Sequence, residues 1–82
     1  MSHYVYILKS LKDNRYYIGE TDDVIKRLNY HNAGLQRSTR NRIPFILIYF
    51  EELDNRLAAL KREKQIKSYK GGEAFKKLIN RK

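Results

Sequence analysis

Residues 3–21 predict a β-hairpin, which commits the chain to an antiparallel sheet. Residues 3–9 (His-Tyr-Val-Tyr-Ile-Leu-Lys) and 15–21 (Arg-Tyr-Tyr-Ile-Gly-Glu-Thr) are rich in the β-branched and aromatic residues that strands favour. The Asp13-Asn14 pair between them is typical of a turn. Gly19, inside the second strand, predicts either a bulge or a close approach to its backbone.

A helix, a loop and a third strand are expected next. The oxygen-bearing side chains of residues 21–23 favour a helix start, and Gly34 is placed to end that helix. Residues 36–44 are polar and basic and predict a flexible loop, whereas residues 45–50 form the most apolar strand, which we expect at the centre of the sheet. The apolar stripe expected on the helix consists of Val24, Ile25 and Leu28.

Two more helices complete the predicted order of elements. Asp54 or Asn55 is placed to cap a helix that runs to about residue 70, where Gly71-Gly72 breaks it. The order strand, strand, helix, strand, helix, helix predicts an α+β fold: a three-stranded antiparallel sheet flanked by helices, in one domain over residues 1–82. The short third helix is expected to bury one face, formed by Ala74, Phe75, Leu78 and Ile79.

The charge balance restricts the expected partners. Lys and Arg number 18 against 9 Asp and Glu, a net charge of +9, which favours a polyanionic partner over a merely well-solvated basic surface. The absence of cysteine excludes disulfides and thiolate metal sites. No apolar run approaches a membrane span, no signal peptide is recognisable, and no stretch has the faces of a membrane-surface helix, so we expect a cytoplasmic location and no membrane partner.

Three positions on the predicted helices carry polar groups that invite a functional interpretation. At 100° per residue Glu63 falls within the apolar arc of its helix, although an i,i+4 ion pair with Lys67 is an equally good explanation of a glutamate there. Arg27 and His31 are also four residues apart and project together, suited to holding a phosphate and moving a proton. An ordinary solvated helix face is the commoner explanation of that pair.

The hairpin tyrosines and the basic loop are further candidates. Strand alternation sends Tyr16 and Tyr17 to opposite faces, and Tyr6 lies in the facing strand. Such tyrosines are more often part of a core than a platform for stacked bases. Phosphate contacts are expected from basic residues of the loop and of the second long helix: Arg37, Arg40, Arg42, Lys64 and Lys67.

The order of these residues resembles the GIY-YIG nuclease superfamily. Tyr4-Val5-Tyr6 and Tyr17-Ile18-Gly19 are similar to the paired motif that names the superfamily, with Tyr4 in place of its first glycine. The resemblance extends over nearly the whole chain and is strongest to small stand-alone bacterial members, related to the N-terminal nuclease domain of UvrC. It continues through Arg27, His31, Asn32-Ala33-Gly34, the strand after Pro44, and Glu63.

The resemblance implies DNA cleavage by phosphodiester hydrolysis at a single Mg²⁺ or Mn²⁺. Carried over by position, Glu63 is the protein ligand of the metal and Arg27 stabilises charge on the phosphoryl oxygens. Tyr6 is the general base, Tyr17 positions water or phosphate, and His31 is a donor or proton relay. The expected partner is nucleic acid, DNA in preference to RNA, read by its structure or non-specifically, with a protein partner as one source of specificity.

Two departures from the family pattern leave rival hypotheses open. Glu20 stands directly after Tyr17-Ile18-Gly19, where a carboxylate facing DNA would repel phosphate. An asparagine that many relatives carry a dozen or so residues beyond the metal glutamate has no counterpart, because Ala74 and Phe75 occupy that region. The alternatives are therefore a non-catalytic, basic nucleic-acid-binding module with the same fold, or a subunit that is active only within a complex.

Overall fold

The computed structural model describes residues 2–80 and opens with the expected hairpin. Strands β1 (His3–Ser10) and β2 (Tyr16–Thr21) pair antiparallel without a break in register, so that Tyr6 faces Gly19 and Leu8 faces Tyr17. Asn14 in the turn has a φ of 61°, a conformation that asparagine tolerates better than most residues. A bulge occurs on the other side of β1, between Ile7 and Leu8 where β1 pairs with β3, and therefore not at Gly19.

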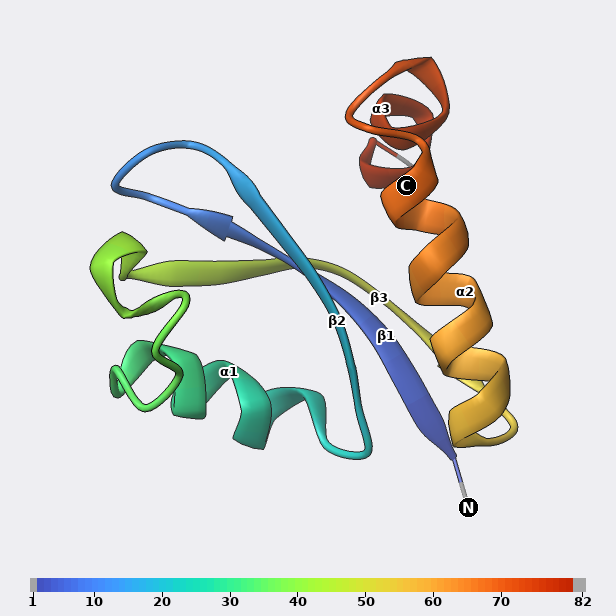
Figure 1. Ribbon diagram of the computed structural model, residues 1–82, viewed down its shortest axis with the longest axis horizontal. Coiled ribbons are helices and arrows are strands. Elements are labelled where there is room, and N and C mark those ends of the chain that lie inside the picture. Colours follow the sequence, from blue (N-terminus) through green and yellow to red (C-terminus); the bar gives the residue numbers. More distant parts are fainter. Residues whose placement is uncertain (1, 81–82) are drawn as a thin grey trace.

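The prediction that the most apolar strand is central was wrong. The strand order is β2-β1-β3, so that β3 (Phe45–Leu53) lies at an edge of the sheet (Figure 1). Val5, Ile7 and Leu8 of β1 are 0% exposed, because a strand pairs with β1 on each side and helices cover both faces of the sheet. The apolar run of β3 includes two side chains left facing solvent, Ile46 at 42% and Phe50 at 55% exposure. Hydrophobicity alone therefore misidentified the centre.

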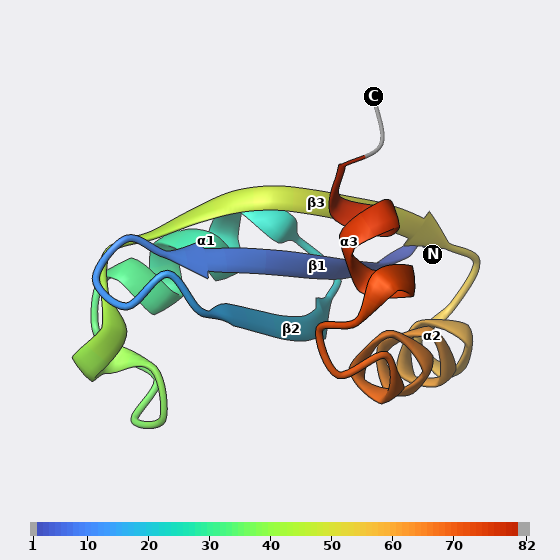
Figure 2. The ribbon, with the colours of Figure 1, turned by 90° about the horizontal axis from the view of Figure 1, so that it is seen from above.

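Helices cover both faces of the sheet (Figure 2). Helix α1 (Val24–Asn32) packs on one face, against the buried side chains of Tyr6, Leu8 and Phe45. Helices α2 (Arg56–Ser68) and α3 (Glu73–Ile79) pack on the opposite face, against β1 side chains of the other parity. The α+β class and the order of elements predicted from the sequence are confirmed. None of the helices within residues 2–80 is long and apolar enough to cross a bilayer.

Local sequence signals explain where the helices begin and end. Asp23 caps α1 by accepting a hydrogen bond from the Lys26 N–H, and Asn55 caps α2 in the same way. Gly34, just beyond α1, has a φ of +75°, which glycine adopts without strain. The apolar stripe predicted on α1 was wrong at Ile25, which is exposed, because only Val24 and Leu28 pack on the sheet.

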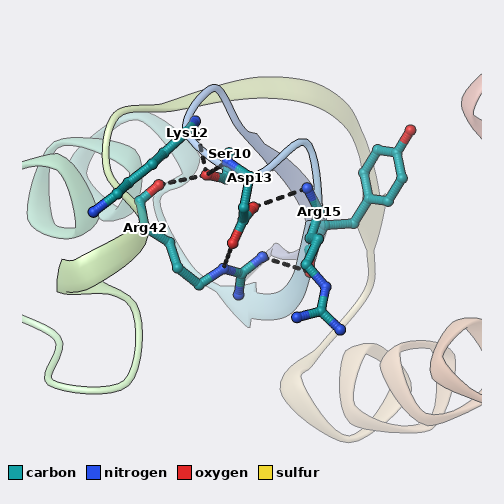
Figure 3. A network of polar contacts seen from close by, with 6 residues as sticks. Ser10, Lys12, Asp13, Arg15 and Arg42 are labelled. Carbon is teal, nitrogen blue, oxygen red and sulfur yellow. Dashed lines mark hydrogen bonds and ion pairs between the residues drawn. The ribbon is translucent and has the colours of Figure 1, made fainter.

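Residues 36–44 are not the flexible loop that their composition predicts. Arg40–Arg42 form one turn of 3-10 helix, and Thr39 just before it is buried. The hairpin turn holds this turn in place (Figure 3): the Ser10 hydroxyl donates to the Arg42 carbonyl, and the Arg42 Nε donates to an Asp13 oxygen at 2.9 Å. The loop therefore has a fixed position relative to β1 and β2.

Candidate nuclease site

The Tyr6 phenol lies at the centre of the candidate site, on the α1 face of the central strand. Its side chain is only 2% exposed, and it lies over Gly19 of β2. A Cβ at residue 19 would lie 2.7 Å from the Tyr6 hydroxyl oxygen, a distance that no real Cβ contact tolerates. The close approach that Gly19 predicted is therefore confirmed, and the tyrosine hydroxyl itself makes it.

His31 is fully buried and bonds to this phenol. The prediction of an ordinary solvated face at this position was wrong, because the α1 helix turns His31 inward against β1 and β3. The His31 Nε2 lies 3.0 Å from the Tyr6 hydroxyl oxygen, and its Nδ1 lies 2.9 Å from Thr39 Oγ1. Burial, with a smaller contribution from Arg27, lowers the pKa of His31 to about 4, so the imidazole is neutral at neutral pH.

The hydrogen-bond network assigns the tautomer of His31. The Thr39 hydroxyl donates to the Gln36 carbonyl, so it accepts from the protonated Nδ1 of the imidazole. Nε2 is then the acceptor, and the Tyr6 O–H donates to it. The Gln36 side chain donates in turn to the Tyr17 hydroxyl at 2.9 Å.

Sequence reasoning missed Thr39 and Gln36. Both lie in the segment interpreted only as a basic loop, and neither residue type carries a charge or a periodic signal that could have found it. The Tyr17 ring completes the cluster, with its centroid 4.8 Å from that of the His31 ring. Tyr16 packs on Phe75 across the sheet, so the predicted opposite directions of the two tyrosines are confirmed.

Arg27 and Glu63 act on the Tyr6 phenol from different helices. Burial is the main reason why the pKa of Tyr6 is raised, with Tyr17 adding to the effect. The Arg27 guanidinium lowers that pKa and the Glu63 carboxylate raises it, so both charges are felt at the phenol. Arg27 is partly exposed, with its Cζ 4.8 Å from the centre of the Tyr30 ring. Glu20, which is not one of the predicted site residues, raises the pKa of Tyr6 as well, so this electrostatic effect does not by itself mark out the site.

Glu63 makes the i,i+4 ion pair with Lys67, and its carboxylate is also largely shielded from solvent. Its carboxylate accepts from Lys67 Nζ at 2.5 Å, the i,i+4 pair, yet the glutamate side chain is only 17% exposed whereas that of Lys67 is 54% exposed. No cluster of three His, Cys, Asp or Glu suited to a metal occurs within residues 2–80. A single shielded carboxylate fits Mg²⁺ or Mn²⁺ that keeps most of its waters, and it does not fit a metal that needs a full protein cage.

Glu20 does not face the phenol cluster. Its parity places it opposite Val5, on the α2 face of the sheet. There the carboxylate bonds to His3 Nε2 at 2.6 Å and approaches Arg56 Nε at 3.6 Å. Two basic side chains therefore occupy the carboxylate, which weakens the argument that it repels a bound phosphate.

The residues predicted to contact phosphate differ in how available they are. Arg37, Arg40 and Lys64 are exposed. Arg42 is paired with Asp13 and lies over the Phe45 ring, and its side chain is only 26% exposed. Lys67 is paired with the candidate metal ligand.

The sequence model of the GIY-YIG catalytic domain family matches residues 2–76 of this chain. The chain belongs to the GIY-YIG family. The family is a nuclease superfamily, so the expected substrate is nucleic acid. The resemblance identified from the motif residues is thereby confirmed, while the roles of the individual side chains stay predictions.

Relatives of this chain carry names that state no activity. A UPF0213 protein of Haloquadratum walsbyi is 50% identical over 68 residues, 82% of this chain and 75% of the relative. A UPF0213 protein of Staphylococcus haemolyticus is 39% identical over 80 residues and 96% of each chain. The solution NMR structure of a UPF0213 protein from Bacillus halodurans is 35% identical, with 90% of each chain covered and a TM-score of 0.48.

Proposed function

We propose that this GIY-YIG domain is a divalent-metal-dependent endonuclease that hydrolyses phosphodiester bonds of DNA, directed by DNA structure or non-specific. The observation that carries the proposal is the buried Tyr6 phenol, hydrogen-bonded to a neutral His31 and subject to the opposite charges of Arg27 and Glu63. A tyrosine used only for packing would need neither a fixed imidazole acceptor nor a glycine beneath its hydroxyl.

The hydrogen bonds support a proton relay from water to His31. Because the Tyr6 O–H is directed to Nε2, the lone pairs of the phenol oxygen remain to accept a hydrogen bond from the attacking water. As the water oxygen bonds to phosphorus and the bond from phosphorus to the leaving oxygen breaks, a water proton passes to Tyr6 and the Tyr6 proton passes to Nε2. The leaving oxygen takes a proton from solvent water, and His31 then returns its extra proton to solvent. No free tyrosinate forms, which the raised pKa of Tyr6 would make costly, and the imidazolium that forms instead is short-lived because burial and Arg27 lower the pKa of His31 to about 4.

Two charged residues complete the proposed site. Arg27 is partly exposed and stabilises the negative charge that develops on the phosphoryl oxygens. Glu63 holds Mg²⁺ or Mn²⁺, and the chemistry that the ion supplies when bound is polarisation of a phosphoryl oxygen. Lys67 would then release the carboxylate, with Nζ free to contact a phosphate.

A plasmid-nicking assay tests the proposal. Purified protein is incubated with supercoiled plasmid and Mg²⁺ or Mn²⁺, comparing the parent with Tyr6→Phe, Arg27→Gln and Glu63→Gln. Glu52→Gln is the matched control for Glu63→Gln, because it makes the same isosteric change at an exposed carboxylate. We expect loss of nicking in the three site variants, by about 100-fold or more for the loss of the general base, and no change in the control. Nicking that survives all three changes would refute the assignment.

The Lys67–Glu63 contact favours one alternative, a non-catalytic nucleic-acid-binding module. In that case the ammonium permanently neutralises the carboxylate and no metal enters. The parent would then bind DNA and nick none of it. Its affinity would fall with salt, with a log–log slope of about −0.9 for each phosphate contacted.

A further inference from the structure

A groove lies on the α2 face of the sheet, opposite the face that carries the Tyr6 phenol, between β2 and the end of α2. It has a volume of about 390 Å³, within the usual range of ligand pockets. Its buried floor is apolar, formed by Ile18, Ile66 and Phe75. The Tyr16 residue stands at its side and is 39% exposed, with its ring inclined at 63° to the Phe75 ring and 5.0 Å between the two ring centres.

Basic side chains surround this groove. Arg15, Lys67 and Lys70 line it and are exposed, and none of its lining residues, all within the described part of the chain, is acidic. The ion pairs found within residues 2–80 engage neither Arg15 nor Lys70. The hollows on the α1 side differ, because Asp22 and Asp23 line them. An anionic ligand with a flat apolar part therefore fits this groove better than it fits those hollows.

Lys67 joins the groove to the candidate metal ligand. It lines the groove and also bonds to Glu63 at 2.5 Å. A strand whose scissile phosphate lies at Glu63 therefore has a neighbouring nucleotide within reach of the groove. An aromatic ring with cations around it is the combination by which proteins hold unpaired bases, through stacking and phosphate contacts.

We propose that the groove binds one unpaired nucleotide of the substrate strand, with its base against Tyr16 and the apolar floor and its phosphates on Arg15 and Lys70. The inference rests on the proposed function in that the substrate is nucleic acid. It deepens that function by making the preferred substrate a strand with a nucleotide free of its duplex, as at a flap or a single-stranded end. A fully paired base cannot enter the groove, because stacking and pairing hold it within the DNA duplex.

The test measures binding without metal, so that it is independent of cleavage. Fluorescence anisotropy in EDTA compares a labelled 12-mer of thymidylate with an abasic 12-mer of the same charge. We expect the parent to prefer the thymidylate strand by about fivefold or more, the lower end of the effect of one stacked base. Tyr16→Leu should remove this preference, and Tyr16→Phe should retain it.

The contribution of the cations is tested at constant net charge. The double variant Arg15→Gln/Lys70→Gln is compared with Lys12→Gln/Lys61→Gln, which removes the same charge at exposed sites outside the groove. We expect a weaker salt dependence only in the groove variant, because the log–log slope should fall by about 0.7 for each single-strand phosphate that the variant no longer neutralises. These variants keep the proposal testable if Tyr16→Leu does not fold.

Three results would overturn the groove proposal: equal affinity for the two strands, equal reductions of the slope in the two double variants, or binding of polyglutamate as tightly as thymidylate. None of these three results bears on the nuclease proposal, which the plasmid-nicking assay tests. Conversely, base-dependent binding in a protein that nicks nothing would support the groove and the binding-module alternative together.

Discussion

Gly19→Ala should lower the free energy of unfolding of this protein more than the addition or removal of one methyl group at its surface. The added Cβ would lie 2.7 Å from the Tyr6 hydroxyl oxygen and 2.8 Å from its Cζ. The phenol cannot simply turn aside, because the tyrosine is 2% exposed and its ring packs against both the Tyr17 and the His31 rings. The added methyl group therefore overpacks the contact between the two strands and displaces the Tyr6 hydroxyl from its hydrogen bond to Nε2.

The packing around Tyr6 sets the size of the effect. Overpacking a closely packed core costs about 1–3 kcal/mol. Breaking the Tyr6–His31 hydrogen bond leaves buried polar atoms unpaired, at about 1–3 kcal/mol more. The free energy of unfolding should therefore fall by about 2–6 kcal/mol. For a domain of this size that lowers Tm by about 8 °C at the least.

Urea and thermal unfolding monitored by circular dichroism measure this destabilisation. Gly71→Ala is the useful comparison, because its φ of +74° imposes backbone strain while nothing lies within 4 Å of its added Cβ. We expect it to cost about 1–2 kcal/mol, from the left-handed backbone alone. A Gly19→Ala protein within about 0.5 kcal/mol of the parent, the range of neutral surface changes, would refute the argument that residue 19 must lack a side chain.

Three further outcomes are expected. The pKa of His31 falls from 6.5 to about 4 on folding, so the unfolded chain binds more protons than the folded protein between pH 4 and 6.5. The free energy of unfolding should therefore fall as the pH drops from 6.5 to 4. His31→Gln should flatten that pH dependence, as measured by urea titrations. Thr39→Val removes the acceptor of the His31 Nδ1–H hydrogen bond. It should lower the free energy of unfolding by about 1–3 kcal/mol and shift the pH profile of nicking. Thr39→Ser keeps a hydroxyl acceptor and should retain both the stability and the pH profile of the parent. Lys67→Gln frees the Glu63 carboxylate and should tighten Mn²⁺ binding about twofold, which corresponds to the free energy of an exposed i,i+4 ion pair. Calorimetry measures this affinity. Lys64→Gln makes the same change in charge and should show a smaller effect or none.

The order of elements followed from the sequence because each boundary carried a local signal. Asn55 and Asp23 are side chains that cap a helix start, and Gly34 is a residue that tolerates a positive φ. The position of β3 could not be derived in this way. Strand order depends on which edges pair, and the apolar run 45–50 is compatible with either a central or an edge strand.

The candidate site was accessible to sequence reasoning only in part. The motif order identified Tyr6, His31 and Glu63, but helical periodicity favoured a solvated His31 because the partners that bury it lie on other elements. The Asp13–Arg42 ion pair joins the hairpin turn to the segment 36–44 that contains Gln36 and Thr39. This tertiary contact has no periodic or compositional signature in the sequence.

Gly19 leaves room for the Tyr6 hydroxyl beside the edge strand β2. Tyr6 belongs to the α1 face and Glu63 to a helix on the other face, yet the glutamate contributes to the pKa of the phenol. Tyr6 stands beside the edge strand β2, and the residue of β2 that faces it is the one without a side chain. A larger residue there would fill the space that the Tyr6 hydroxyl occupies above the edge strand. The glycine of the motif is therefore required by the packing of the Tyr6 phenol against β2, whatever chemistry the phenol performs.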